Sequence, residues 1–120
     1  MEKLTKQEED AMQLVWENDG GFVKELLEQM QGEKTPYTTL ASTMKNLERK
    51  GYVKGVKYAN AYRYIPVIAK EEYKKKFMNG FVNHYFKNSY KELVSFFAKE
   101  EKISAEELKD ILKMIDNQQK

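Results

Sequence analysis

The 120-residue sequence contains no cysteine and only one histidine. Without cysteine the chain forms no disulfide, no thiolate metal site and no thiol nucleophile. The histidine, His84, has no cluster of His, Asp or Glu around it at the spacing of metal ligands. The serine and threonine hydroxyls are accompanied by neither a general-base arrangement nor a Gly-rich phosphate loop. The sequence therefore predicts a protein that is not an enzyme and has no metal site or cofactor.

Long apolar runs are also missing. No run approaches the roughly 18 apolar residues of a membrane span, and the first ten residues, MEKLTKQEED, are too charged for a signal peptide. We therefore expect a cytoplasmic protein with no membrane partner. The chain is 41% apolar, but its 33% charged residues and mean hydropathy of −0.79 indicate a thin core. A second copy often completes a thin core of this kind.

Charge is unevenly distributed, although the formal net charge is only +2. Residues 1–33 carry nine acidic and three basic side chains, a net of −6. Residues 34–63 carry seven Lys or Arg and one Glu, a net of +6, and residues 64–120 have a net of +2. A basic segment between flanks that are not basic is the footprint expected for a polyanion such as DNA.

Helices are the expected elements of the first part of the chain. Thr5 and Glu8 have the capping-box spacing of a helix start, and residues 18–21 have the composition of its end. A second, short helix is predicted over about residues 22–31. A third is predicted over about residues 38–50.

A two-stranded hairpin is predicted after the third helix. Gly51 is well placed to end that helix, and residues 52–58 and 61–65 have the β-branched and aromatic bias of strands. The turn between them is expected at residues 59–60, where Asn60 best tolerates a positive φ. Three helices followed by a hairpin is the order of a winged helix. The predicted fold class is therefore mainly α with a small β-hairpin wing.

The chain is predicted to be helical again from about residue 68, and the first of these helices carries an aromatic stripe. Tyr73, Phe77, Phe81 and Tyr85 recur every four residues and so form a helical stripe, which is more often core or dimer interface than a ligand pocket. We predict a winged-helix DNA-binding domain over residues 1–67 and a helical dimerisation domain over residues 68–120. The residues expected at the dimer interface are Tyr73, Phe77, Phe81, Tyr85, Leu93, Phe96, Phe97, Leu108, Ile111, Leu112 and Ile115.

The third helix has two distinct faces. Leu40, Met44 and Leu47 fall together on one side, so the hydroxyl-rich and basic side must point outwards. Such a helix fits the major groove, about 12 Å wide, with short hydroxyls close to base edges and cations near phosphates. The residues expected to contact DNA are Thr38, Thr39, Ser42, Lys45, Asn46 and Arg49 in the groove, with Lys50, Lys54, Lys57 and Arg63 as phosphate contacts.

Other interpretations of these patterns remain open. The basic helix and hairpin are also compatible with an ordinary solvated surface. A winged helix can serve as a protein-interaction module that binds no DNA. The aromatic stripe is compatible with a ligand-gated regulator that has a pocket at the dimer seam.

The order of these motifs resembles the BlaI/MecI/CopY family of bacterial transcriptional repressors over nearly the whole chain. The likeness is carried by Leu4-Thr5 with Glu8, Met12 and Trp16, by Tyr37-Thr38-Thr39-Leu40 with Ser42, Met44, Leu47 and Lys50-Gly51, by Tyr62, Tyr64 and Pro66, by Phe86-Lys87-Asn88-Ser89 with Leu93-Val94 and Phe97, and by residues 103–108. The resemblance implies a homodimer that binds an inverted-repeat operator in double-stranded DNA through two copies of the third helix.

The resemblance also implies how such a repressor is released. In the antibiotic-resistance branch a sensor-linked protease cleaves the dimerisation region, which weakens the dimer and with it DNA binding. The cleaved bond there is typically Asn-Phe, whereas the aligned pair here is Phe96-Phe97. The copper-sensing branch uses a Cys-rich tail, and the absence of cysteine excludes that route. Neither the operator, the regulated genes nor the inducing signal follows from the sequence.

Overall fold

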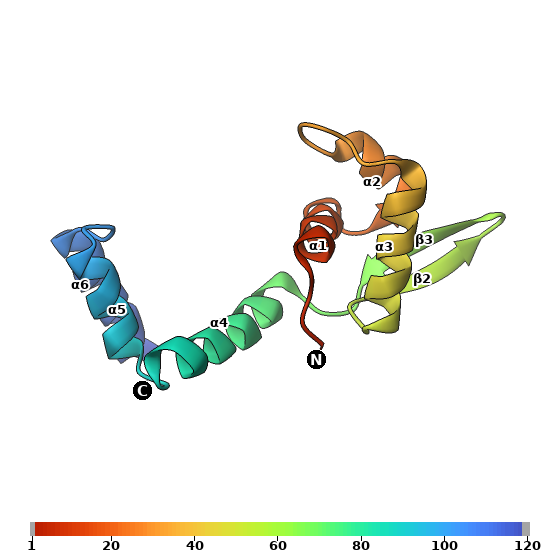
Figure 1. The fold of residues 1–120 in the computed structure, drawn as a ribbon. Coiled ribbons are helices and arrows are strands. Elements are labelled where there is room, and N and C mark those ends of the chain that lie inside the picture. The colour runs from red at the N-terminus through yellow and green to blue at the C-terminus, as the bar shows by residue number, and fades with distance from the viewer. Residues whose placement is uncertain (1, 119–120) are drawn as a thin grey trace. The chain divides into compact units, whose positions relative to one another are not determined.

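The computed structural model describes residues 2–118, except the side chains of Leu112 and of residues 114–118. The chain divides into two compact units, Met1–Tyr73 and Lys74–Lys120. The elements are α1 (Lys6–Asn18), β1 (Gly21–Phe22), α2 (Val23–Gln29), α3 (Tyr37–Arg49), β2 (Val53–Tyr58), β3 (Ala61–Pro66), α4 (Lys70–Phe86), α5 (Tyr90–Lys99) and α6 (Ala105–Gln118) (Figure 1). This confirms the predicted fold class, mainly helical with a small hairpin.

Local capping fixes both ends of α1. The amide of Glu8 donates to Thr5 Oγ1 at 3.2 Å, and the amide of Thr5 donates to Glu8 Oε1 at 2.8 Å, which confirms the capping box. The helix ends at Asp19 in the left-handed region, and Gly20 follows with φ of +88°. A Cβ at Gly20 would lie 2.5 Å from the carbonyl oxygen of Tyr64, so the chain passes closely beside β3 only because this residue is glycine.

The three strands form one antiparallel sheet in the order β1-β3-β2. Gly21 pairs with Tyr64 and Phe22 with Arg63, so β1 is a short third strand that the sequence analysis did not predict. The predicted second helix is correspondingly too long, since Phe22 belongs to β1 and α2 ends at Gln29. In the hairpin turn Ala59, not Asn60, has the positive φ, at 54°.

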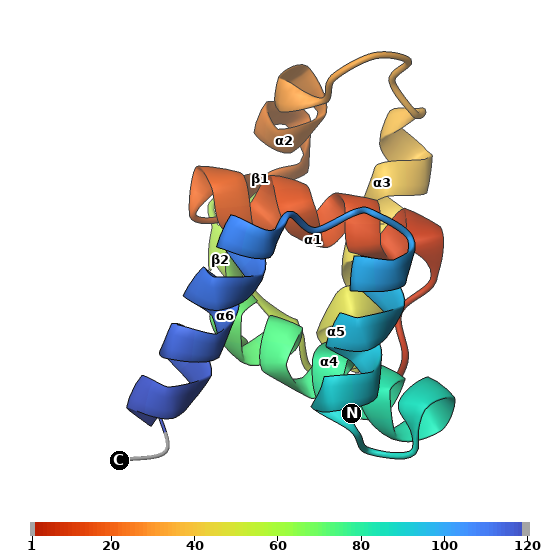
Figure 2. The ribbon, with the colours of Figure 1, turned by 90° about the vertical axis from the view of Figure 1, so that its left-hand side faces the viewer.

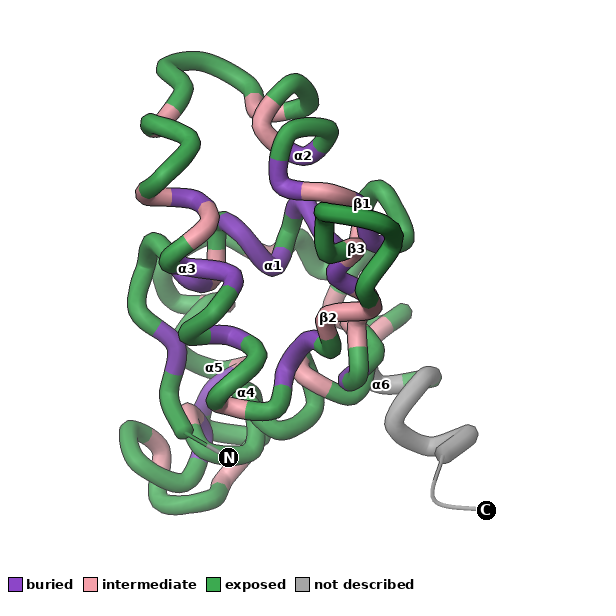
Figure 3. The backbone as a smooth tube through the Cα atoms, turned by 90° about the vertical axis from the view of Figure 1, so that its right-hand side faces the viewer, coloured by how far each residue is buried: buried purple, intermediate pink, exposed green. Residues whose placement is uncertain are grey.

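The core of the first unit lies between α1, α2, α3 and the sheet, where Figure 3 shows the buried positions. Met12, Val15, Leu26, Met44 and Leu47 are completely buried there. Burial of each such side chain contributes about 1.5–3 kcal/mol before conformational entropy is counted. The apolar face predicted for α3 is therefore the face that packs, and the opposite face is left to solvent.

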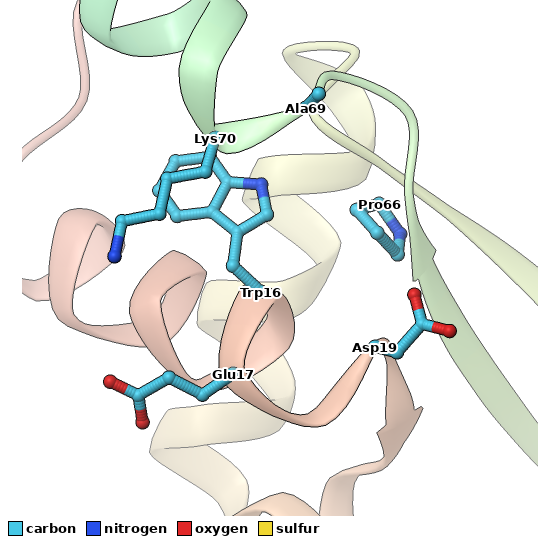
Figure 4. Close-up of a pocket in the computed structure, with 6 residues that line it drawn as sticks. All are labelled: Trp16, Glu17, Asp19, Pro66, Ala69 and Lys70. Atoms are coloured by element: carbon cyan, nitrogen blue, oxygen red, sulfur yellow. The ribbon is translucent and has the colours of Figure 1, made fainter.

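The start of α4 belongs to the first unit. The ring of Tyr73 lies 5.4 Å from that of Trp16 and 5.9 Å from that of Tyr52, and Trp16 Nε1 donates to the carbonyl of Ile68 at 2.9 Å. Burial raises the pKa of the Tyr73 hydroxyl. Tyr73, predicted at the dimer interface, thus packs against the winged-helix core. The packing leaves a pocket beside Trp16 (Figure 4), lined also by Glu17, Asp19, Pro66, Ala69 and Lys70.

The second unit consists of the rest of α4, α5 and α6, joined by short loops (Figure 2). Ser89 caps α5 by accepting from the amide of Glu92, and Ser104 and Glu107 form a reciprocal capping box before α6. Val82 and Leu93 are its buried apolar side chains among the residues described. A chain of ring contacts at 5.0–6.2 Å joins α4 to α5 through Phe77, Phe81, Tyr85, Phe86, Phe96 and Phe97.

Much of the predicted dimer surface is exposed in the single chain. Phe77, Tyr85, Phe96 and Phe97 are large exposed aromatic side chains of this unit, whereas Phe81, Leu108 and Ile111 are partly buried. Leu93 is buried. The side chains of Leu112 and Ile115 lie outside the described part of the structure. The dimer interface stays a prediction.

Candidate nucleic-acid interface

Helix α3 presents the predicted groove-contacting residues on its solvent side. Leu40, Thr43, Met44 and Leu47 are buried, so the register of the helix is set by packing. Thr43, which the apolar pattern did not include, is tolerated inside because its hydroxyl donates to the carbonyl of Thr39 at 2.9 Å. Thr39 itself is half-buried. The exposed members of the predicted set are Thr38, Ser42, Lys45, Asn46 and Arg49.

A hydrogen bond ties the end of α3 to the hairpin. The amide of Gly55 in β2 donates to Glu48 Oε2 at 2.8 Å. A Cβ at Gly55 would lie 3.0 Å from the same oxygen and 3.2 Å from Tyr64 Cε1, so a larger residue would push the helix and strand apart. The contact also directs the one carboxylate of the basic segment towards the strand. Helix and hairpin thus form one connected surface.

The register of the hairpin separates its basic residues onto two faces. Gly55 pairs with Tyr64 and Lys57 with Tyr62, and alternate residues of a strand share a face. Because Tyr64 is buried against the core, this is the face towards α3, and Lys57 and Tyr62 continue it beyond the core. Lys45 Nζ of α3 indeed lies 5.4 Å from the centre of the Tyr62 ring.

The other predicted hairpin cations lie on the opposite face. Lys54 and Arg63 alternate with Gly55 and Tyr64 along their strands. The Arg63 side chain is half-buried, and its Nη2 donates to the carbonyl of Asp19 at 3.1 Å. The structure therefore places Lys57 beside the exposed face of α3, and places Lys54 and Arg63 on the other side of the hairpin.

Lys50 lies in a different environment from the other predicted phosphate contacts. Its ammonium is 2.7 Å from Glu8 Oε1 and 3.0 Å from the carbonyl of Lys3, and only 10% of its side chain is exposed. Burial disfavours the charged form of Glu8, but hydrogen bonds from Lys50 and Thr5 prevail and hold the pKa of its carboxyl below the ordinary value. Lys50 therefore stabilises the fold and is withdrawn from the surface that we consider for DNA.

The N-terminal segment completes this arrangement. The Tyr52 hydroxyl donates to the carbonyl of Glu2 at 2.8 Å, so the residues before α1 are held across the end of α3. Arg49 approaches the carboxylate of Glu2 at 4.0 Å, but both side chains are about two-thirds exposed and the pair is weak. Arg49 thus keeps its place on the solvent side of α3.

Two exposed tyrosines of this surface were not among the predicted site residues. Tyr37 begins α3 and is 53% exposed, and Tyr62 lies next to Lys45 as described above. The alternation of side chains in the hairpin could have identified Tyr62, because Tyr62 stands opposite Lys57. Which face of the hairpin turns towards α3 depends on tertiary packing, and the strand pattern alone did not reveal it.

Among the residues described, no group of three or more His, Cys, Asp or Glu side chains is arranged to hold a metal ion. No described helix is both long and apolar enough to cross a membrane.

Comparison with known proteins gives two matches. The sequence model of the family described as penicillinase repressor matches residues 4–117. A penicillinase repressor of Staphylococcus aureus is 29% identical over 114 residues, which cover 92% of this chain and 90% of the relative. The family model thus includes nearly all of the first unit and all but the last three residues of the second.

Proposed function

Because the chain belongs to the penicillinase repressor family and is a transcriptional repressor, we propose that it acts by binding an inverted-repeat DNA operator as a homodimer. The observation that carries this proposal is the exposed face of α3. The apolar side of the helix is buried in the core. Hydroxyl, amide and cationic side chains project from the other side, and the helix is narrow enough to enter the major groove.

Each part of this surface has a distinct role in the proposal. Thr38 and Ser42 are short enough to allow close approach of α3 to the bases, and Asn46 can pair with adenine. Lys45, Arg49 and Lys57 supply the cations that displace counterions from phosphates. Contacts to phosphates position the protein, and contacts to base edges determine which sequence it prefers.

The second unit is proposed to hold two chains together. Its exposed aromatic rings, including Tyr85 and Phe96, are the kind of surface that a second copy covers. Two linked winged helices then bind two half-sites of one operator. Once the first half-site is bound, the second binding event is intramolecular, which raises the affinity far above that of one unit.

Release by regulated proteolysis is the last part of the proposal. The Phe96-Phe97 bond lies inside α5, so a sensor-linked protease can cut it only after at least one turn of that helix has opened. Cleavage would remove α6 and part of α5 from the dimer. A chain truncated after Phe96 should therefore bind the complete operator no more tightly than it binds a single half-site.

Selection of bound duplexes from random DNA tests the proposal. We expect enrichment of an inverted repeat whose half-sites lie about one helical turn, or a multiple of it, apart. Failure to enrich any inverted repeat, with the chain folded and dimeric, would contradict operator binding and favour a winged helix that binds protein instead.

A further inference from the structure

We propose that Tyr62 positions Lys45, and that Lys45, Tyr62 and Lys57 together bind one backbone phosphate of DNA where α3 meets the hairpin. This inference rests on the proposed DNA-binding function. It adds Tyr62 to the proposed interface. It also gives Lys57 a role that Lys54 lacks, although the sequence pattern alone does not distinguish these two lysines.

The Lys45 ammonium lies beside the Tyr62 ring. A long side chain on an exposed helix face has many rotamers, yet Nζ lies 5.4 Å from the centre of the Tyr62 ring. That distance is within the range of a cation–π interaction, which at an exposed site stabilises by only a small amount. The ring therefore directs the ammonium towards the hairpin without neutralising it. Its three N–H donors remain able to bind an anion.

The register of the hairpin places Lys57 next to Tyr62. Lys57 stands directly opposite Tyr62 in the antiparallel pair, and directly opposed side chains lie on the same face with Cβ atoms about 4.5–5.5 Å apart. Lys57 therefore leaves the hairpin on the same face as Tyr62 and directly beside it. The Tyr62 hydroxyl adds an O–H donor to these two lysines, and the hairpin itself contains no carboxylate that could pair with them.

The neighbouring carboxylate, that of Glu48, is hydrogen-bonded to the hairpin backbone. Glu48 lies three residues after Lys45 on α3, which is close enough to compete for its ammonium. The amide of Gly55 binds the Glu48 carboxylate instead, at 2.8 Å. The cluster of two cations and one hydroxyl therefore has the chemistry of a phosphate site. It fits the DNA backbone at the edge of a groove that α3 occupies.

The hairpin offers matched controls on its opposite face. Tyr58 is 55% exposed and Tyr62 45%, and Tyr58 also touches another ring, that of Phe22 at 6.0 Å. Lys54 and Lys57 are both exposed lysines of β2. Tyr58→Leu and Lys54→Ala therefore remove the same chemistry from the side that we place away from DNA.

The test measures the affinity of the full chain for its selected operator and for an unrelated duplex, over a range of salt concentrations. We expect Tyr62→Leu to weaken binding to both duplexes by about two- to fivefold. Tyr62→Phe, which keeps the ring and removes only the hydroxyl donor, should lose less affinity than Tyr62→Leu. Lys45→Ala and Lys57→Ala should each reduce the slope of log affinity against log salt by about one, and Lys54→Ala should leave it unchanged.

A double mutant separates positioning from an independent contact. If Tyr62 acts mainly through Lys45, Tyr62→Leu in the Lys45→Ala background should cost much less affinity than in the wild type. The inference is overturned if the two losses simply add, or if Tyr62→Leu and Tyr58→Leu weaken binding equally. Thermal unfolding of each variant confirms that it is folded. If the wild type itself bound neither duplex, that result would instead contradict the proposed function.

Discussion

The ammonium of Lys50 and the carboxylate of Glu8 lie 2.7 Å apart, although 42 residues separate them in the sequence. The same carboxylate caps α1 through the amide of Thr5, so one side chain joins the start of the first helix to the end of the third. This pair holds the C-terminal end of α3 against the start of α1. The exposed face of α3 keeps its orientation as a result.

Breaking this buried pair should destabilise the fold strongly. Lys50→Met leaves the Glu8 carboxylate without its partner, and removal of one member of a buried pair costs about 3 kcal/mol. Lys6→Met is the control, because Lys6 and Asp10 are also 2.7 Å apart but 86% and 58% exposed, and it should cost less than about 0.5 kcal/mol. Urea denaturation measures both. Equal effects would contradict the structural role of Lys50.

The Glu8 carboxyl should also give the protein an acid-sensitive component of stability. Its pKa is lower in the folded chain than in the unfolded chain, where it is about 4.3. The resulting stabilisation is present at neutral pH and is lost as pH falls below that value towards the folded pKa. The free energy of unfolding of the wild type should therefore fall more between about pH 5 and pH 3 than that of Glu8→Gln. Parallel pH profiles would show that the pair contributes nothing.

Gly20 should tolerate no side chain. In Gly20→Ala the Cβ would meet the Tyr64 carbonyl at 2.5 Å, and the backbone would keep a φ of +88°. Gly32→Ala is a matched control, since Gly32 has φ of +74° but no atom within 4 Å of the added Cβ. The control should lose about 1 kcal/mol from backbone strain alone, and Gly20→Ala more than about 2 kcal/mol. Urea denaturation measures both variants. Similar denaturation midpoints for the two would show that the close approach of Gly20 to β3 is unimportant.

Substitutions on α3 should change which DNA sequence is preferred. Ser42→Ala and Asn46→Ala remove groups that we propose contact base edges, so they should alter the sequence enriched from random DNA. Lys57→Ala should weaken binding to all sequences alike, because phosphates carry no sequence information. Unchanged preferences in both α3 variants would show that this helix does not read the bases.

The aromatic surface of the second unit should be required for dimerisation. Tyr85 is 66% exposed, so Tyr85→Asp places a charge at the proposed interface with little effect on the packing of a single chain. Asn83→Asp adds the same charge on the opposite side of α4 and serves as the control. Sedimentation should show a weakened dimer for Tyr85→Asp alone. A dimer unaffected by either change would place the interface elsewhere.

Features specified by local chemistry were predictable from the sequence. The capping box at Thr5, the end of α3 at Gly51 and the apolar face of α3 each depend on residues within a few positions of one another. They appear in the structure as predicted. The exposed side of α3 followed directly from its buried side.

Features specified by contacts distant in the sequence were not predictable in this way. Strand β1 is only two residues long and exists because it pairs with Arg63 and Tyr64. Lys50 carries the same charge as Lys54 and Lys57, and only its distant partner Glu8 distinguishes it. Tyr73 has the spacing of the aromatic stripe, but Trp16 and Tyr52 determine where it packs. Pattern alone assigns a residue to a face, and tertiary packing decides what that face meets.

The most direct test of the account compares binding of the full chain to a complete inverted repeat and to one half-site, with the stoichiometry determined by sedimentation. We expect two chains on the complete repeat, and an affinity for it at least roughly a hundredfold above that for the half-site. One chain on the complete repeat, or equal affinities for the two duplexes, would contradict repression by a homodimer whose two α3 helices bind one operator.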